Sequence, residues 1–175
     1  GLSKALVPML QELGPNVQLA VTVQTHAWLR PSEVARIGSE RQVLGGRWHR
    51  WAARLPLRFK GMFAVWCAQF HGVLIGLTLR WTMFYGAHRV SVLWGAIGVD
   101  PFSLVRLSAA ARTAGLCFEA YVVDDIETHP ANVRRRNVAS IIGARFRRAA
   151  RLYAITPQLA ERLATRYGVR AIHLP

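Results

Sequence analysis

The sequence is poor in acidic residues, in lysine and in cysteine. It has 9 Asp and Glu against 23 Lys and Arg, which gives a formal net charge of +14, and its only lysines are Lys4 and Lys60. A positive field of this size attracts phosphates, so nucleic acid, anionic lipid and nucleotide-bearing substrates all remain open as partners. The arginine content is equally consistent with a general compositional bias of the genome.

Cysteine and histidine give no sign of a metal or disulfide framework. Cys67 and Cys117 lie inside apolar runs, which predicts buried thiols in a reducing compartment. No CxxC, HxxxH or HExxH motif occurs. The N-terminus lacks the charged start and the cleavage pattern of a signal peptide. We therefore expect no metal and a cytoplasmic protein, with peripheral association at the inner face of the membrane as a second setting.

One long apolar segment has no charged residues, although the chain as a whole is rich in arginine. Gly61 to Leu79 carries no charged residue and has the length of a membrane-spanning helix. Its polar residues and its two interior glycines, Gly72 and Gly76, make it only moderately hydrophobic. We predict a buried crossover helix over Pro56 to Tyr85, broken near Gly72 or Gly76. A spanning helix and a helix lying in the lipid interface are the alternatives.

The N-terminal third of the chain has less regular patterning. Ser3 to Leu13 has the apolar spacing of a helix and ends at Gly14-Pro15, and Asn16 to Val23 then reads as a strand. Residues 25–58 are rich in Arg and Trp and show no clean period. The length and the 52% apolar content favour one domain over residues 1–175.

From residue 90 onward, short apolar runs alternate with capped helices. Asp100-Pro101 and Thr156-Pro157 have the residues of helix starts, Asn132 is predicted to cap a basic helix that runs to Ala150, and Gly168 ends the last helix. Strands are predicted over Val90–Trp94, Cys117–Val123, Leu152–Ile155 and Ala171–Leu174. This alternation predicts an α/β, Rossmann-like fold with a largely parallel sheet.

Asp124 and Asp125 directly follow the second of these strands. In open α/β sheets, ligands bind beyond the carboxyl ends of the strands, so both aspartates are catalytic candidates. The alternative is that one caps the next turn and the other is solvated. Five further residues are candidates for contact with an acceptor or a phosphate: His129 in the same loop, Arg134 and Arg135 in the next helix, and Gly95 and Gly98 in the turn before Asp100.

A resemblance to a known family lies within Val90 to Pro175, in the runs CFEAYVVDDI, RLYAIT, LAERLATRYG and VRAIHLP. In series they resemble the N-terminal domain of GT-B fold glycosyltransferases, particularly the group-4-like family. The resemblance implies transfer of a sugar from a nucleotide-sugar donor to a hydroxyl of a sugar or lipid-linked acceptor, without a further cofactor. It also implies a missing first strand and a missing donor-binding domain after Pro175, so we expect this piece alone to be inactive.

The chain departs from that family at the strand tip. Many members have a histidine followed by an aspartate there, whereas this sequence has Asp124 and Asp125. Glu119 and Glu127 match the spacing of the family's paired glutamates, which belong to the second domain, and we interpret this match as chance. Two alternatives without catalysis stay open: a nucleic-acid binder that uses Arg30 to Arg58, and a module that binds a membrane surface.

Overall fold

The computed structural model describes residues 57–85, 91–98, 100–128 and 138–174. The predicted helix Ser3–Leu13 and the predicted strand Asn16–Val23 lie outside the described residues, as does nearly all of the Arg/Trp-rich region 25–58. The described residues therefore belong to the C-terminal two thirds of the chain.

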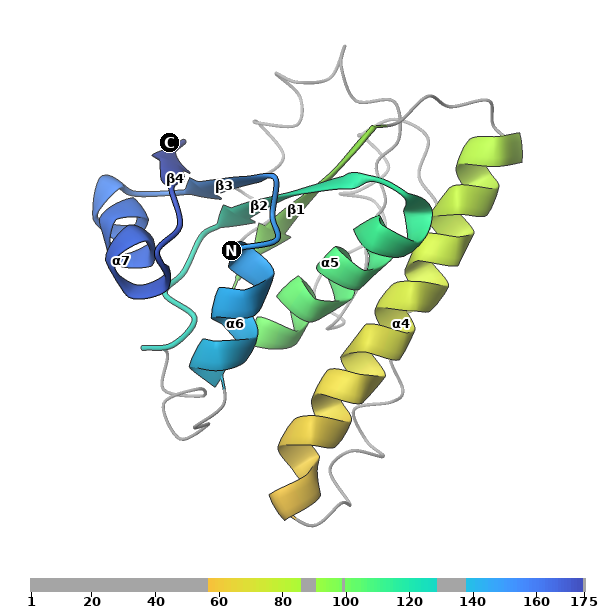
Figure 1. The fold of residues 1–175 in the computed structure, drawn as a ribbon, viewed down its shortest axis with the longest axis horizontal. Coiled ribbons are helices and arrows are strands. Elements are labelled where there is room, and N and C mark those ends of the chain that lie inside the picture. The colour runs from red at the N-terminus through yellow and green to blue at the C-terminus, as the bar shows by residue number, and fades with distance from the viewer. Residues whose placement is uncertain (1–56, 86–90, 99, 129–137, 175) are drawn as a thin grey trace, which may run out of the picture.

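Four parallel strands form one sheet in the order β1-β2-β3-β4 (Figure 1). This arrangement confirms the predicted α/β, Rossmann-like fold class. In chain order the elements are α4 (Leu57–Tyr85), β1 (Val92–Ile97), α5 (Pro101–Ala114), β2 (Cys117–Val122), α6 (Val138–Phe146), β3 (Arg151–Ala154), α7 (Pro157–Tyr167) and β4 (Ala171–His173).

The helices that connect the strands lie on one face of the sheet (Figure 1). Each strand pairs with the next one in the chain, and right-handed crossovers then place α5, α6 and α7 on the same side. Phe118, Ala120 and Val122 of β2 are buried in the core with Ile142 and Phe146 of α6. This core positions the carboxyl ends of the strands beside the N-terminal ends of the helices.

Local capping chemistry fixes where two of the helices begin. The Asp100 carboxylate accepts a hydrogen bond from the N–H of Phe102 at 3.0 Å, and the Thr156 hydroxyl accepts one from the N–H of Leu159 at 3.1 Å. Asp100 also pairs with the buried Arg106 at 2.7 Å. Gly168, with φ of 63°, ends α7 in the left-handed region. The predicted helix starts at Pro101 and Pro157 and the predicted stop at Gly168 are confirmed.

Two predicted boundaries are wrong. The first strand runs on to Ile97 instead of ending at Trp94, because Gly95 and Ile97 continue the register with β2. The basic helix ends at Phe146 instead of Ala150, because the N–H of Ala150 donates to the carbonyl of Phe118 at 2.7 Å and so already follows the sheet. The other three strands lie within one residue of their predicted bounds.

Helix α4 is unbroken and packs along α5, where a break near Gly72 or Gly76 was expected (Figure 1). A Cβ atom at Gly72 would lie 2.4 Å from the carbonyl oxygen of Arg106, and one at Gly76 would lie 2.6 Å from that of Ala110. The glycines therefore allow close helix contact and do not kink the helix. Between them, Ile75 is buried against Ala110.

The prediction that α4 is buried is wrong for most of its surface. In its most apolar stretch, within Met62–Tyr85, 28% of the residues are buried, and this helix is long and apolar enough to cross a membrane by length and composition. Among the described residues it packs through one face, against α5, and large apolar side chains on its opposite face are exposed. The prediction of two buried cysteines is also wrong, because Cys117 is exposed at the first position of β2 and Cys67 is half-buried.

Candidate functional site

A groove runs from the carboxyl end of β2 along α7, between the loop that follows this strand and helices α6 and α7. Its volume is about 850 Å³. The floor is apolar and includes Val122, Ile142 and Phe146, whereas the rim carries charged side chains from the loop and from α7. Asp124 and Asp125 both line it, so the structure brings the predicted acidic doublet to a concave surface at the expected edge of the sheet.

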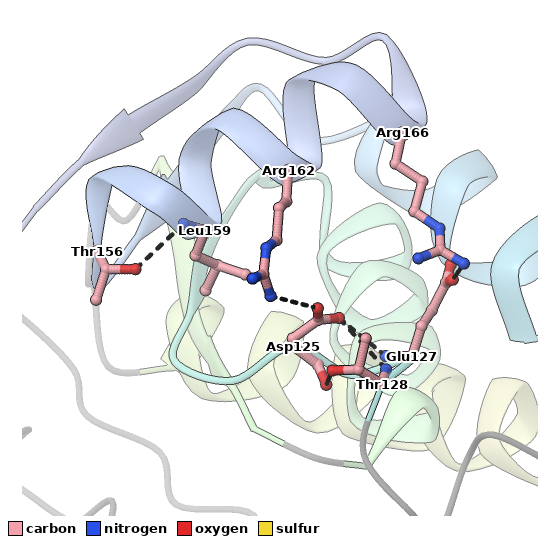
Figure 2. A network of polar contacts seen from close by, with 7 residues as sticks. All are labelled: Asp125, Glu127, Thr128, Thr156, Leu159, Arg162 and Arg166. Carbon is pink, nitrogen blue, oxygen red and sulfur yellow. Dashed lines mark hydrogen bonds and ion pairs between the residues drawn. The ribbon is translucent and has the colours of Figure 1, made fainter.

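Asp125 is half-buried and holds the loop that follows β2 (Figure 2). One of its carboxylate oxygens lies 3.3 Å from the N–H of Glu127 and 3.5 Å from that of Thr128. The other lies 3.4 Å from a guanidinium nitrogen of Arg162 on α7. A carboxylate that accepts from backbone N–H groups two and three residues ahead forms a turn, so Asp125 shapes the loop and connects it to α7.

Glu127 is the most deeply placed carboxylate of the groove region. Its side chain is 7% exposed, accepts a hydrogen bond from the Tyr167 hydroxyl, and pairs with Arg166 (Figure 2 shows the ion pair). Burial raises the pKa of Glu127, the positive charge of Arg166 opposes this, and the nearby Asp125 raises it further. Glu127 therefore joins the loop to the last turn of α7.

Asp124 has a different environment from its neighbour. It is exposed at the rim of the groove, and in the part of the chain that the structure describes no hydrogen bond or ion pair is recorded for its side chain. A solvated carboxylate on a fixed loop can accept a proton from a bound hydroxyl or face a positive charge. Of the two aspartates, Asp124 is thus the one whose side chain is available to a ligand.

The remaining predicted site residues do not gather in this groove. Gly95 is buried in β1, where a Cβ atom would lie 2.7 Å from the Leu107 side chain of α5, and it does not line the groove. Gly98 follows β1 at the same edge of the sheet as Asp124 but does not line the groove. His129, Arg134 and Arg135 lie outside the described residues.

Four residues of this site were not predicted as site residues from the sequence: Glu127, Arg162, Arg166 and Tyr167. Arg162 and Arg166 are four residues apart on a predicted helix, which places them on one face. That spacing was the available signal. The partners of this face come from a loop about forty residues earlier, a contact that only the tertiary fold creates.

The charged rim suits an anionic or hydroxyl-bearing ligand. Arg162 is 68% exposed and only loosely paired with Asp125, so its guanidinium can turn toward a phosphate without leaving a buried charge unpaired. Among the described residues, no three His, Cys, Asp or Glu side chains are grouped to hold a metal ion.

The buried Glu127 leads to a prediction on pH. Because its pKa is raised in the folded state, the native protein binds a proton at a higher pH than the unfolded chain does. The free energy of unfolding of the wild type, relative to that of Glu127→Gln, should therefore increase as the pH falls through the folded-state pKa toward the unfolded value. Urea unfolding of both proteins across that range measures the difference.

The exposed Glu161 on α7 provides the matched control, since Glu161→Gln also removes one negative charge from the groove. If the difference between wild type and Glu127→Gln instead decreased on acidification, pairing with Arg166 would outweigh burial. The assignment of Glu127 as a carboxyl destabilised by burial would then be wrong.

Comparisons with known proteins bring no further assignment. No family model matches the chain, no curated protein matches its sequence and no solved structure matches its fold.

Proposed function

We propose that this chain forms the acceptor-side domain of a glycosyltransferase that moves a sugar from a nucleotide-sugar donor to an acceptor hydroxyl. The observation that carries the proposal is the groove at the carboxyl end of β2, with the exposed carboxylate of Asp124 at its rim. Its place in a parallel sheet is where open α/β folds bind ligands. The sequence resemblance of residues 90–175 supports the same activity.

Asp124 is the proposed base at the acceptor. Its carboxylate takes the proton of the acceptor hydroxyl while that oxygen bonds to the anomeric carbon of the donor sugar. The bond from the anomeric carbon to the diphosphate breaks in the same transfer, and its electron pair leaves with the nucleoside diphosphate. This role needs an accessible carboxylate, and the exposed position of Asp124 beside the apolar floor of the groove provides one.

Asp125, Glu127 and the arginines have positioning roles in this proposal. Asp125 holds the backbone of the loop on which Asp124 stands. Glu127 connects that loop to α7 through its ion pair with Arg166 (Figure 2) and through the hydrogen bond that it accepts from Tyr167. Arg162, at the open side of the groove, is placed to donate to an anionic group of a bound ligand. The donor-binding half of the cleft belongs, in this proposal, to a second domain that continues the chain.

Hydrogen exchange of the natural full-length protein tests where ligands bind. UDP-glucose and GDP-mannose are added in turn, each with and without a mixture of simple sugars as acceptors. We expect at least one combination to slow exchange in residues 124–128 and in α7, because a ligand in the groove covers that loop and stabilises its contacts with the helix.

The turn at residues 115–117 serves as an internal control, because it lies at the opposite edge of the sheet, before β2, and does not line the groove. Protection confined to that edge, or protection elsewhere with none in 124–128, would contradict a ligand site beyond the carboxyl ends of the strands.

A further inference from the structure

The outer face of α4 is an uninterrupted apolar surface. Large side chains recur every three or four residues along it, which places them on one side of the helix. This outer stripe consists of Phe63, Trp66, Phe70, Leu74, Leu77, Trp81 and Phe84, with exposed fractions from 39% to 78%. An apolar strip of this length on the surface of a soluble protein usually marks an interaction site.

The outer stripe lies opposite the face that packs on α5. Ala68, Gly72, Ile75 and Leu79 are buried on the inner face, about half a turn round the helix from Phe70 and Trp81. The close approach at Gly72 fixes α4 against the domain through that inner face. The helix can therefore present its stripe to a partner while it stays docked on α5.

The polar groups beside the stripe are already satisfied within the helix. The Thr78 hydroxyl donates to the carbonyl of Leu74 at 2.9 Å, and the Thr82 hydroxyl donates to the carbonyl of Thr78 at 2.8 Å. Hydroxyls bonded back to their own helix do not need water. Thr78 and Thr82 can therefore enter an apolar environment without leaving a hydroxyl unpaired.

One flank of α4 carries positive charge. Gln69 and Arg80 both lie roughly a quarter of a turn from the stripe, on the same side of the helix. Gln69 accepts a hydrogen bond at 3.1 Å from Arg145 at the end of α6. Arg145 forms an arginine cluster with Arg112 and Arg148, both exposed.

Among the described residues, no acidic side chain forms an ion pair with any of these three arginines. Burial lowers the pKa of Arg145, and the charges of Arg148 and Arg112 lower it further. An anion bound there would relieve this repulsion. Because Gln69 connects the cluster to α4, that anion would lie beside the stripe.

From this combination of stripe and cluster, we infer that α4 docks the protein on an anionic phospholipid surface, parallel to the membrane plane. The outer stripe enters the acyl boundary, and Arg80 and the arginine cluster bind lipid phosphates alongside it. The net charge of +14 favours the same partner over an apolar protein surface. This inference does not depend on the proposed function, since a domain without catalytic activity could dock in the same way.

Vesicle co-sedimentation of the natural full-length protein tests the inference, with phosphatidylcholine vesicles that contain or lack phosphatidylglycerol. The wild type is expected to bind the anionic vesicles more strongly, and the double variant Trp66→Ser, Trp81→Ser should bind both kinds at least about tenfold more weakly. Arg112→Gln with Arg148→Gln should weaken binding to anionic vesicles only, by about fivefold for each arginine removed.

The matched controls are Ile172→Ser and Arg170→Gln, which change an exposed apolar and an exposed basic residue near the far edge of the sheet. Neither should alter vesicle binding. Equal loss in the controls and in the α4 variants would overturn the assignment of this helix as the docking surface.

Other occupants of the stripe give distinct results. A second copy would give a dimer in light scattering without lipid, which the tryptophan variant dissociates. Cover by another segment of this chain would make the same variant less stable to heat without changing vesicle binding. A spanning helix would resist extraction with alkaline carbonate, whereas a helix lying in the interface is released. Each of these outcomes would overturn the inference.

Discussion

Gly72→Val is expected to lower the free energy of unfolding by about 3 kcal/mol, because the new side chain meets backbone that cannot move aside. Its Cβ would lie 2.4 Å from the carbonyl oxygen of Arg106 and 2.7 Å from the Cβ of Ala109. Helix α4 must then move away from α5, and this uncovers Ile75 and Leu79, which are 1% and 4% exposed. Valine and glycine differ little in helix propensity, so the loss reports packing.

Thr78→Val is the matched control on the same helix. Thr78 is exposed, and valine has nearly the same shape, so we expect a change within about 0.5 kcal/mol. Urea unfolding followed by far-ultraviolet circular dichroism measures both variants. If Gly72→Val were as stable as Thr78→Val, α4 would not pack closely on α5, and the orientation of its outer stripe would lose its basis.

Capping residues made much of this fold predictable. The starts of α5 at Pro101 and of α7 at Pro157 follow from an aspartate or threonine before a proline, which is chemistry confined to a few neighbouring residues. The parallel sheet followed from the alternation of short apolar runs with such helices. The carboxyl-end position of Asp124 then followed from the direction of β2.

The exposure of α4 could not be predicted in the same way. A helix that is apolar on nearly all sides has no pattern that distinguishes its packed face from its outer face. Gly72 and Gly76, four residues apart, were interpreted as a break, although the same spacing places both on one face for close contact with α5. The choice between these readings needs the position of the neighbouring helix.

The side-chain contacts at the rim of the groove could not be predicted from the sequence for a different reason. Glu127 meets Arg166 and Tyr167 only because the loop after β2 folds back on α7. Side-chain pairs between distant segments leave no periodic signal. Asp125 likewise reads as a second catalytic candidate in the sequence, and only its bonds to the loop backbone identify it as the residue that shapes the turn.

Asp124→Asn in the natural full-length protein is expected to reduce sugar transfer by about a hundredfold to ten-thousandfold, the usual range for loss of a general base. Asparagine keeps the size of the side chain but cannot take up the proton of the acceptor hydroxyl. Because Asp124 is exposed and has no recorded partner among the described residues, we expect little change in stability. Thermal unfolding checks that the variant is folded.

Glu161→Gln is the control for charge in the same groove, and its turnover should stay close to that of the wild type. Asp125→Asn should weaken the loop, so it should lower stability as well as turnover. This pairing separates a residue that touches the reacting atoms from one that positions them.

The most direct test of Asp124 as the base is the rate of nucleoside diphosphate release from the nucleotide sugar that protects residues 124–128, compared between wild type and Asp124→Asn. We predict release by the wild type in the presence of acceptor and its near loss in a folded Asp124→Asn protein. Release at the wild-type rate from Asp124→Asn would show that Asp124 is not the base.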